Sequence, residues 1–151
     1  MPDAAADQPV SPETGTDTRL ALIVDPTQPP GLLANTAAVI AVGLGAADGS
    51  LGAVPLLDSR GRATASIANR PIPVLQADGA VLAALLARAL PAPPGAVVVA
   101  FPRFGRSLHV FEDYRALFPS RDLLEEPVEG IGLAGPARWV KSLTGSLKLL
   151  R

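Results

Sequence analysis

The chain has 151 residues, of which 48% are hydrophobic, and a formal net charge of −1 at pH 7. This length suits one domain with a substantial core and is too short for two domains of ordinary size. The sequence contains no cysteine and one histidine, which excludes a disulfide framework and a thiolate nucleophile and disfavours a zinc or iron site. We therefore expect a single domain with no metal and no cofactor.

The beginning of the sequence bears on localisation. Residues 1–7 have neither the basic region nor the apolar region of a signal peptide. Each longer apolar run further along is interrupted by Gly, Pro or a charge, so no membrane span is predicted. We expect a cytoplasmic protein that does not bind membranes.

Residues 1–18 differ in composition from the rest of the chain. They hold four acidic residues and no basic residue, and they are rich in Ala, Pro, Ser and Thr. Such a segment has too little apolar surface to offset the entropy lost on ordering. We predict a disordered acidic tail over residues 1–18 and a single α/β domain over residues 19–151.

The first part of the predicted domain contains a strand and a helix. Residues 19–24 form a short apolar run that ends at Asp25, which is typical of a buried strand. The predicted helix over residues 31–44 is apolar on nearly every face except at Asn35 and Thr36. A helix of this kind must be covered on more than one side.

The middle of the chain continues the alternation of predicted strands and helices. Residues 54–57 predict a strand, and residues 58–61 predict a turn after it. Residues 72–75 predict a strand whose neighbouring prolines place it at an edge or in an irregular position. A helix over residues 81–90 follows, with Asp78 as its N-cap.

The last third adds two strands and two helices. The predicted strands cover residues 96–101 and 127–133, and between them a helix starts at Ser107 or Leu108 and ends at Pro119. In the final helix Gly135 is the predicted N-cap, Pro136 occupies the first turn, and Gly145 ends the helix in a left-handed conformation. Gly43-x-Gly45 and Gly130-x-Gly132 lack the context of a nucleotide-binding loop and are interpreted as turns. Strands separated by helices in this way indicate an α/β sheet with helices on both faces.

Several separated segments carry a family resemblance. The ending Gly-Pro-x5-Ser-Leu-Thr-Gly-x-Leu-Lys-Leu-Leu, residues 135–150, is similar to the closing segment of type II peptidyl-tRNA hydrolases. The segments at 29–35, 58–61, 71–75 and 143–147 resemble those of a bacterial family of unknown function, DUF2000, over residues 19–151. That family is itself similar in fold to the hydrolases. The resemblance implies a three-layer α/β/α sandwich around a mixed, mostly parallel sheet of the peptidyl-tRNA hydrolase II type.

The resemblance does not extend to the catalytic positions. The hydrolases have a lysine at the start of the first helix, where this chain has Gly31 or Leu32, and an aspartate after a middle strand, where it has Arg103. No lysine precedes Lys141. The sequence therefore indicates a protein that binds a small ligand or a partner. The alternative is a hydrolase of peptidyl-tRNA or of a related ester or amide, with arginines and Lys141 contacting phosphate.

The expected partners are a small molecule or RNA, together with a second copy of the chain through an apolar face. Six residues are the candidates for ligand binding: Asn35, Arg103, Ser107, His109, Lys141 and Thr144. Asn35 needs a partner on an apolar helix, and a core hydrogen bond and a ligand contact are equally good interpretations. His109 could meet Asp113 at helical i, i+4 spacing, but a surface or core-edge role is favoured over a catalytic one. Thr144 beside the helix end indicates local hydrogen bonding.

Overall fold

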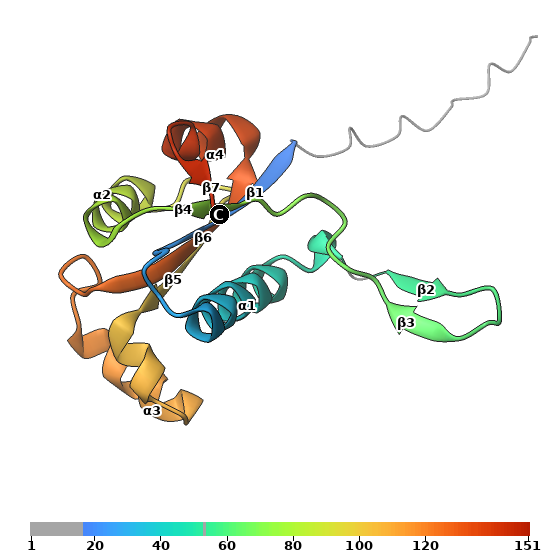
Figure 1. Cartoon of the computed structure of the whole chain (residues 1–151), viewed down its shortest axis with the longest axis horizontal. Helices are drawn as coiled ribbons and strands as arrows, with labels where there is room; N and C mark the ends of the chain where they lie inside the picture. The colour runs from blue at the N-terminus through green and yellow to red at the C-terminus, as the bar shows by residue number, and fades with distance from the viewer. Residues whose placement is uncertain (1–16, 53) are drawn as a thin grey trace, which may run out of the picture.

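The structure, a computed structural model, describes residues 17–52 and 54–151 (Figure 1). The predicted tail therefore lies outside the described residues, apart from its last two. A five-stranded sheet has the order β5-β6-β1-β4-β7. Its strands are β1 (Thr18–Val24), β4 (Val74–Gln76), β5 (Val97–Pro102), β6 (Val128–Pro136) and β7 (Lys148–Leu149).

The sheet is mixed but mainly antiparallel. β1 and β4 are parallel, whereas β5–β6, β6–β1 and β4–β7 are antiparallel pairs. The expectation of a mostly parallel sheet is therefore wrong. Alternating helices and strands do not fix strand direction, and here β6 inserts between β5 and β1 and runs opposite to both. β4, predicted at an edge or in an irregular position, has β1 on one side and the two-residue β7 on the other.

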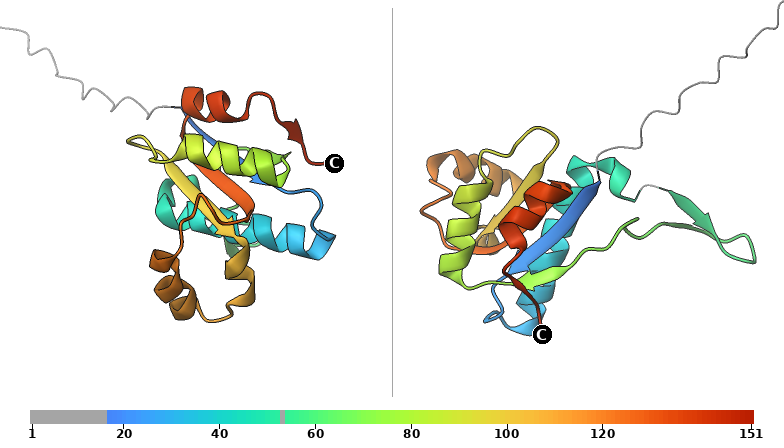
Figure 2. Two further views of the ribbon diagram at one scale, coloured as in Figure 1. Left: turned by 90° about the vertical axis from the view of Figure 1, so that its left-hand side faces the viewer. Right: turned by 90° about the horizontal axis from the view of Figure 1, so that it is seen from above.

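Helices lie on both faces of this sheet (Figure 2). α1 (Pro30–Ala47) packs on one face, and α2 (Gly79–Ala89) and α4 (Ala137–Thr144) pack on the other. Side chains alternate along a strand, so Ala21 and Ile23 of β1 join the cluster under α2 and α4. Leu20 and Leu22 join the cluster under α1.

Gly130 and Gly132 lie inside β6 beneath α1, so their interpretation as a turn is wrong. A Cβ on Gly130 would be 2.8 Å from Thr36 Cγ2, and a Cβ on Gly132 would lie far inside van der Waals contact of Ile40 Cγ2. The missing side chains let the helix come close to the sheet. Gly43 and Gly45 are likewise helical, within α1.

The outer side of α1 is exposed and apolar, although the sequence predicts cover on more than one side. Only Thr36, Ile40 and Leu44 of α1 are buried, and the Val42 side chain is 72% exposed. Within the described residues, α1 is the one helix whose length and apolar composition would allow it to cross a membrane. This corrects the expectation that every apolar run is interrupted. Its buried residues pack on the sheet, so this helix is part of the domain core.

A hairpin projects from the body, and we call residues 54–67 the hairpin arm (Figure 1). It contains β2 (Pro55–Leu57) and β3 (Ala63–Ala65), which pair antiparallel with each other. The predicted turn at 58–61 is confirmed: Asp58 Oδ1 accepts the backbone N–H groups of Arg60 and Arg62, and Gly61 has φ of 75°. A short 3₁₀ helix, η1 (Gly49–Leu51), precedes the arm.

Three predictions about helix ends are wrong. Residues 103–107 form a 3₁₀ helix, η2 (Arg103–Ser107), and α3 (Phe111–Leu117) begins only after it, followed by η3 (Phe118–Ser120). Gly135 is not an N-cap, because it pairs with Arg19 in the sheet, and β6 continues to Pro136. Gly145 has φ of −61°, so α4 ends without a left-handed residue.

Candidate functional site

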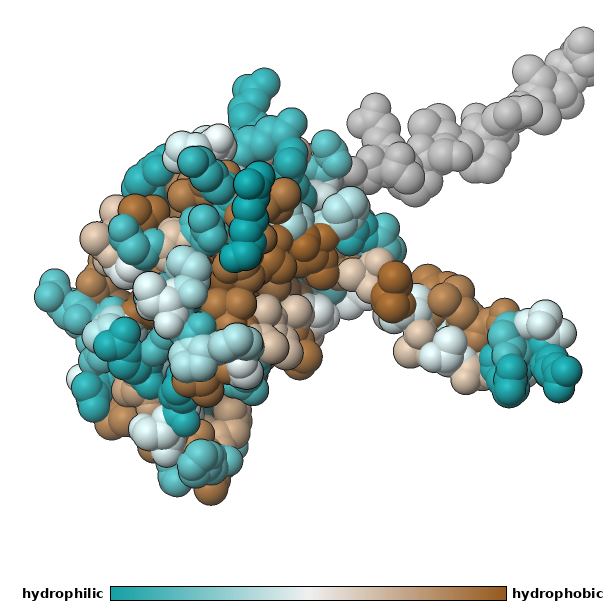
Figure 3. All heavy atoms as spheres, viewed as in Figure 1, coloured by the Kyte–Doolittle hydropathy of each residue, from teal (hydrophilic) through white to brown (hydrophobic). Residues whose placement is uncertain are grey.

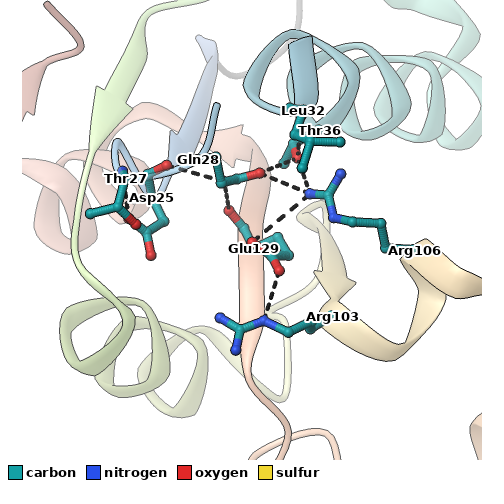
Figure 4. A network of polar contacts seen from close by, with 8 residues as sticks. All are labelled: Asp25, Thr27, Gln28, Leu32, Thr36, Arg103, Arg106 and Glu129. Carbon is teal, nitrogen blue, oxygen red and sulfur yellow. Dashed lines mark hydrogen bonds and ion pairs between the residues drawn. The ribbon is translucent and has the colours of Figure 1, made fainter. Parts of the chain in front are cut away.

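A buried carboxylate, Glu129, is the centre of a polar network at the edge where β1 and β5 end and β6 begins (Figure 4). The register of β5 and β6 passes from Phe101 opposite Gly130 to Pro102 opposite Val128, so Glu129 lies in a β-bulge. A bulge redirects side chains relative to the regular alternation of a strand. The Glu129 side chain is 8% exposed.

Two arginines of η2 bind this carboxylate. Arg103 Nε lies 2.8 Å from Glu129 Oε1, and Arg106 Nη2 lies 3.9 Å from Oε2. A 3₁₀ helix has three residues per turn, so residues 103 and 106 lie on the same side of it. The Arg103 side chain remains 62% exposed, whereas that of Arg106 is largely buried.

Arg106 connects the carboxylate to α1 and to the loop before it. Its Nη2 donates to Gln28 Oε1 at 2.8 Å and to Thr36 Oγ1 at 2.9 Å. Gln28 Nε2 in turn donates to the backbone oxygens of Asp25 and Glu129. The network therefore connects the ends of β1 and β5, the start of β6 and the first turns of α1.

The second terminal nitrogen of Arg106, Nη1, makes no hydrogen bond within the described residues, unlike Nη2. Nη1 is buried and has no hydrogen-bond partner within residues 17–52 and 54–151. The guanidinium also lies over the Phe101 ring, with Cζ 5.1 Å from the ring centroid. A buried donor without an acceptor is costly. Arg106 therefore retains one unused donor beside an aromatic wall.

A cavity of about 540 Å³ lies next to this network, between α1, β5, η2 and α3. Its walls are mainly apolar. The apolar lining includes Val39, Val42, Val99, Phe101 and Tyr114, and the polar lining consists of Asn35, Arg106 and His109. A concave apolar surface with a few convergent polar groups is the usual form of a small-molecule site.

The structure brings some of the six predicted residues together and separates others. Asn35 and His109 line the same cavity, and Arg103 belongs to the adjacent network. Ser107 Oγ donates to the backbone oxygen of Phe104 at 3.0 Å. These four lie on one side of the molecule, near the end of β5.

Lys141 and Thr144 do not join them, because α4 packs on the opposite face of the sheet. Thr144 Oγ1 donates to the Val140 oxygen at 2.8 Å, the local bond that the sequence indicates. His109 precedes α3, so the helical i, i+4 spacing by which it could have met Asp113 is not formed.

The sequence analysis missed Gln28 and Glu129 and did not connect Thr36 with Arg106. One signal was available: Glu129 is the only charged residue in β6, which is otherwise small and apolar. A charge in a buried strand requires a partner. The identity of that partner depends on the bulge, which the sequence does not reveal.

Tyr114, the only tyrosine of the chain, packs against Phe104 and Phe118, each with ring centroids 5.6 Å away. Burial raises the pKa of Tyr114 above its ordinary value of 10.0. The folded state thus favours the neutral phenol, so this contribution to stability is complete below pH 10 and is lost as pH rises through the folded-state pKa.

We expect alkaline absorbance titration of Tyr114 to give a midpoint above 10 in the folded protein. The unfolded chain should titrate near 10, and Tyr114→Phe should remove the absorbance change; a midpoint at or below 10 in the folded protein would contradict burial.

These features define an α/β protein with a mainly antiparallel sheet and a polar network beside a cavity. The family model described as "Protein of unknown function (DUF2000)" matches residues 18–151, so the chain belongs to that family. The structure is similar to that of the protein of unknown function Atu0240 from Agrobacterium tumefaciens strain C58, with a TM-score of 0.79 and 21% identity. The match covers 88% of this chain and 97% of the other. No protein of curated function matches the chain.

Proposed function

We propose that the protein binds a small molecule in the cavity between α1, β5 and α3. The observation that carries this proposal is the combination of apolar walls with three polar side chains at one place, Asn35, Arg106 and His109. The apolar walls favour a ligand with an apolar body, because burying that body removes its surface from water.

The polar side chains define the other part of the ligand. Arg106 lines the cavity with a positively charged guanidinium, which favours a carbonyl or carboxylate oxygen on the ligand. Glu129 balances part of the arginine charge, and the Phe101 ring fixes the guanidinium in place. The ligand class is therefore a small apolar molecule with an oxygen acceptor.

A hydrolase of peptidyl-tRNA or of a related ester or amide is the second candidate. One observation favours it: the carboxylate of Glu129 in β6 lies 2.8 Å from Arg103, which stands where the resemblance places an aspartate. Hydrolysis needs a group free to take a proton from water. Both oxygens of Glu129 face arginines and the side chain is buried, so binding has more support than hydrolysis.

The resemblance in sequence also supports two finer proposals. We propose that the helices on the two faces of the sheet form a three-layer sandwich of the peptidyl-tRNA hydrolase II type. We also propose that the protein acts in the cytoplasm, where a domain without cysteine folds independently of the redox state.

The binding proposal can be tested with anilinonaphthalene sulfonate, a fluorescent probe with an apolar body and anionic oxygens. We expect one saturable site per chain and weaker binding of N-phenylnaphthylamine, which lacks the sulfonate. Val39→Glu places a negative charge in the cavity wall and should weaken binding of the sulfonate about tenfold or more, a loss of about 1.4 kcal/mol or more.

Val81→Glu on α2 is the matched control, because it changes the same residue type on another helix at similar exposure, 40% against 46% for Val39. It should leave the affinity unchanged. Equal losses in the two variants, or the absence of a saturable site, would contradict binding in this cavity. Circular dichroism and thermal unfolding would verify that both variants are folded.

A further inference from the structure

The hairpin arm has little support from its own chain. Every residue of β2 and β3 is exposed, and the two strands pair only with each other. Leu57 is 72% exposed and Ile67 is 86% exposed. An isolated two-stranded hairpin is marginally stable in water, and exposed apolar clusters of this kind typically mark contact surfaces.

The apolar surface of the arm continues over the body. Ile67 and Val42 line one cavity of about 440 Å³ at the base of the arm. Val42 and Phe111 line the larger cavity described above. One apolar surface therefore extends from the arm over α1 to the start of α3, and Figure 3 shows the arm as hydrophobic up to a hydrophilic tip.

The two ends of this surface carry opposite charges. Arg60 and Arg62 lie at the tip of the arm, and Arg62 is paired with Asp58 at 2.7 Å. Arg60 has no ion pair in the described part of the chain. At the other end, Glu112 and Asp113 lie in the first turn of α3, and Asp113 has no ion pair within that same part.

Arg60 and Asp113 do not meet within one chain, because the arm projects to the right of the body and α3 lies apart from it at the lower left (Figure 1). Their charges can be satisfied if the arm of one copy reaches α3 of another. The same contact then forms twice, since each copy has both an arm and a receiving surface. Such a self-complementary contact is the property of a two-fold symmetric dimer.

We propose that the hairpin arm docks on a second copy of this chain. The arm of each copy lies along the exposed side of α1 of the other, with Leu57 covering Val42. Arg60 at the tip then lies beside Asp113 of the other copy. The inference does not rest on the ligand proposed above, although Val42 belongs both to the docking surface and to the lining of that cavity.

Light scattering after size exclusion, with sedimentation velocity across a concentration series, tests this assembly. The native chain should have twice the mass of one copy, and Leu57→Asp should give a folded monomer, because it buries a charge in the interface. Leu124→Asp, which changes another exposed leucine away from the arm and α1, should remain a dimer. A native chain that is monomeric at every concentration would overturn the proposal.

A charge exchange tests the predicted pairing. Arg60→Asp and Asp113→Arg should each weaken the dimer about fivefold or more, and the double variant should recover most of the loss, because close charge pairs couple by about 1 kcal/mol or more. Additive losses in the double variant would overturn this arrangement.

The absence of cysteine allows a direct test of which surfaces meet. A Leu57→Cys chain and a Val42→Cys chain with a different tag should cross-link when mixed with a short bismaleimide. A Leu124→Cys chain should not cross-link to Val42→Cys. Cross-linking of both pairs to the same extent, or flotation of monomers with lipid vesicles in place of dimerisation, would refute the dimer.

Discussion

Replacing Gly132 with alanine is expected to lower the free energy of unfolding by about 2–3 kcal/mol, as overpacking of a tight core does. The new methyl group would collide with Ile40 of α1 and crowd Leu44, and α1 would have to move away from β6. Equilibrium urea unfolding followed by circular dichroism would measure the change. Because α1 also carries Thr36 and Asn35, the displacement should weaken probe binding in the cavity as well.

Gly45→Ala is the control for this substitution. Gly45 lies in α1 with open space around the position of a Cβ, so alanine should stabilise the protein by up to about 1 kcal/mol through helix propensity. Ile40→Ala alone leaves a cavity, and combined with Gly132→Ala it should cost less than the sum of the two single changes, because the new methyl fills part of that space. Strict additivity would show that the two positions are not in contact.

Glu129→Gln is expected to destabilise the protein by about 2–3 kcal/mol, because it leaves the largely buried Arg106 without a counter-charge. Glutamine keeps the size of the side chain and one acceptor oxygen, so the loss reports charge and not volume. Urea unfolding would measure it. The same variant should also weaken binding of the fluorescent sulfonate if the network positions Arg106 for the ligand.

Arg103→Gln tests the exposed side of the same network. Arg103 is mostly in solvent, so its ion pair with Glu129 should contribute about 1 kcal/mol or less. If Arg103→Gln lowered the free energy of unfolding as much as Glu129→Gln does, Arg106 would not be the arginine that relies most on the Glu129 carboxylate.

The sequence was sufficient to locate most elements of the domain. The runs at 19–24 and 96–101 are continuous, apolar and rich in β-branched residues, and both are central to strands of the sheet. Asp78 caps α2 as expected, accepting the Val81 N–H at 2.9 Å. These features are local, so local patterns reveal them.

Strand direction and several boundaries were not predictable in this way. The placement of β6 between β5 and β1 depends on contacts between residues more than a hundred positions apart. Pro136 is compatible with the first turn of a helix, but pairing with Thr18 keeps it in the strand. Residues 103–107 form a 3₁₀ helix before α3, where the sequence predicts that the helix itself begins at Ser107 or Leu108.

The candidate site was predictable only in part. Asn35 was recognisable as a polar residue on an apolar helix, and it does line the cavity with His109. The network around Glu129 was not recognisable, because its members come from a loop, a helix, a 3₁₀ turn and a bulge. Their sequence separations, such as the 101 residues between Gln28 and Glu129, carry no periodic signal.

The position of β6 also determines how late the centre of the sheet can form during synthesis. β1 emerges first, yet its longest partner ends at Pro136, and β5 reaches β1 only through that same strand. A nascent chain that has reached residue 120 therefore holds β1 and β5 without the strand that joins them. Pairing at such separation makes folding slow and leaves strand edges open meanwhile. The centre of this sheet thus closes after translation of most of the domain.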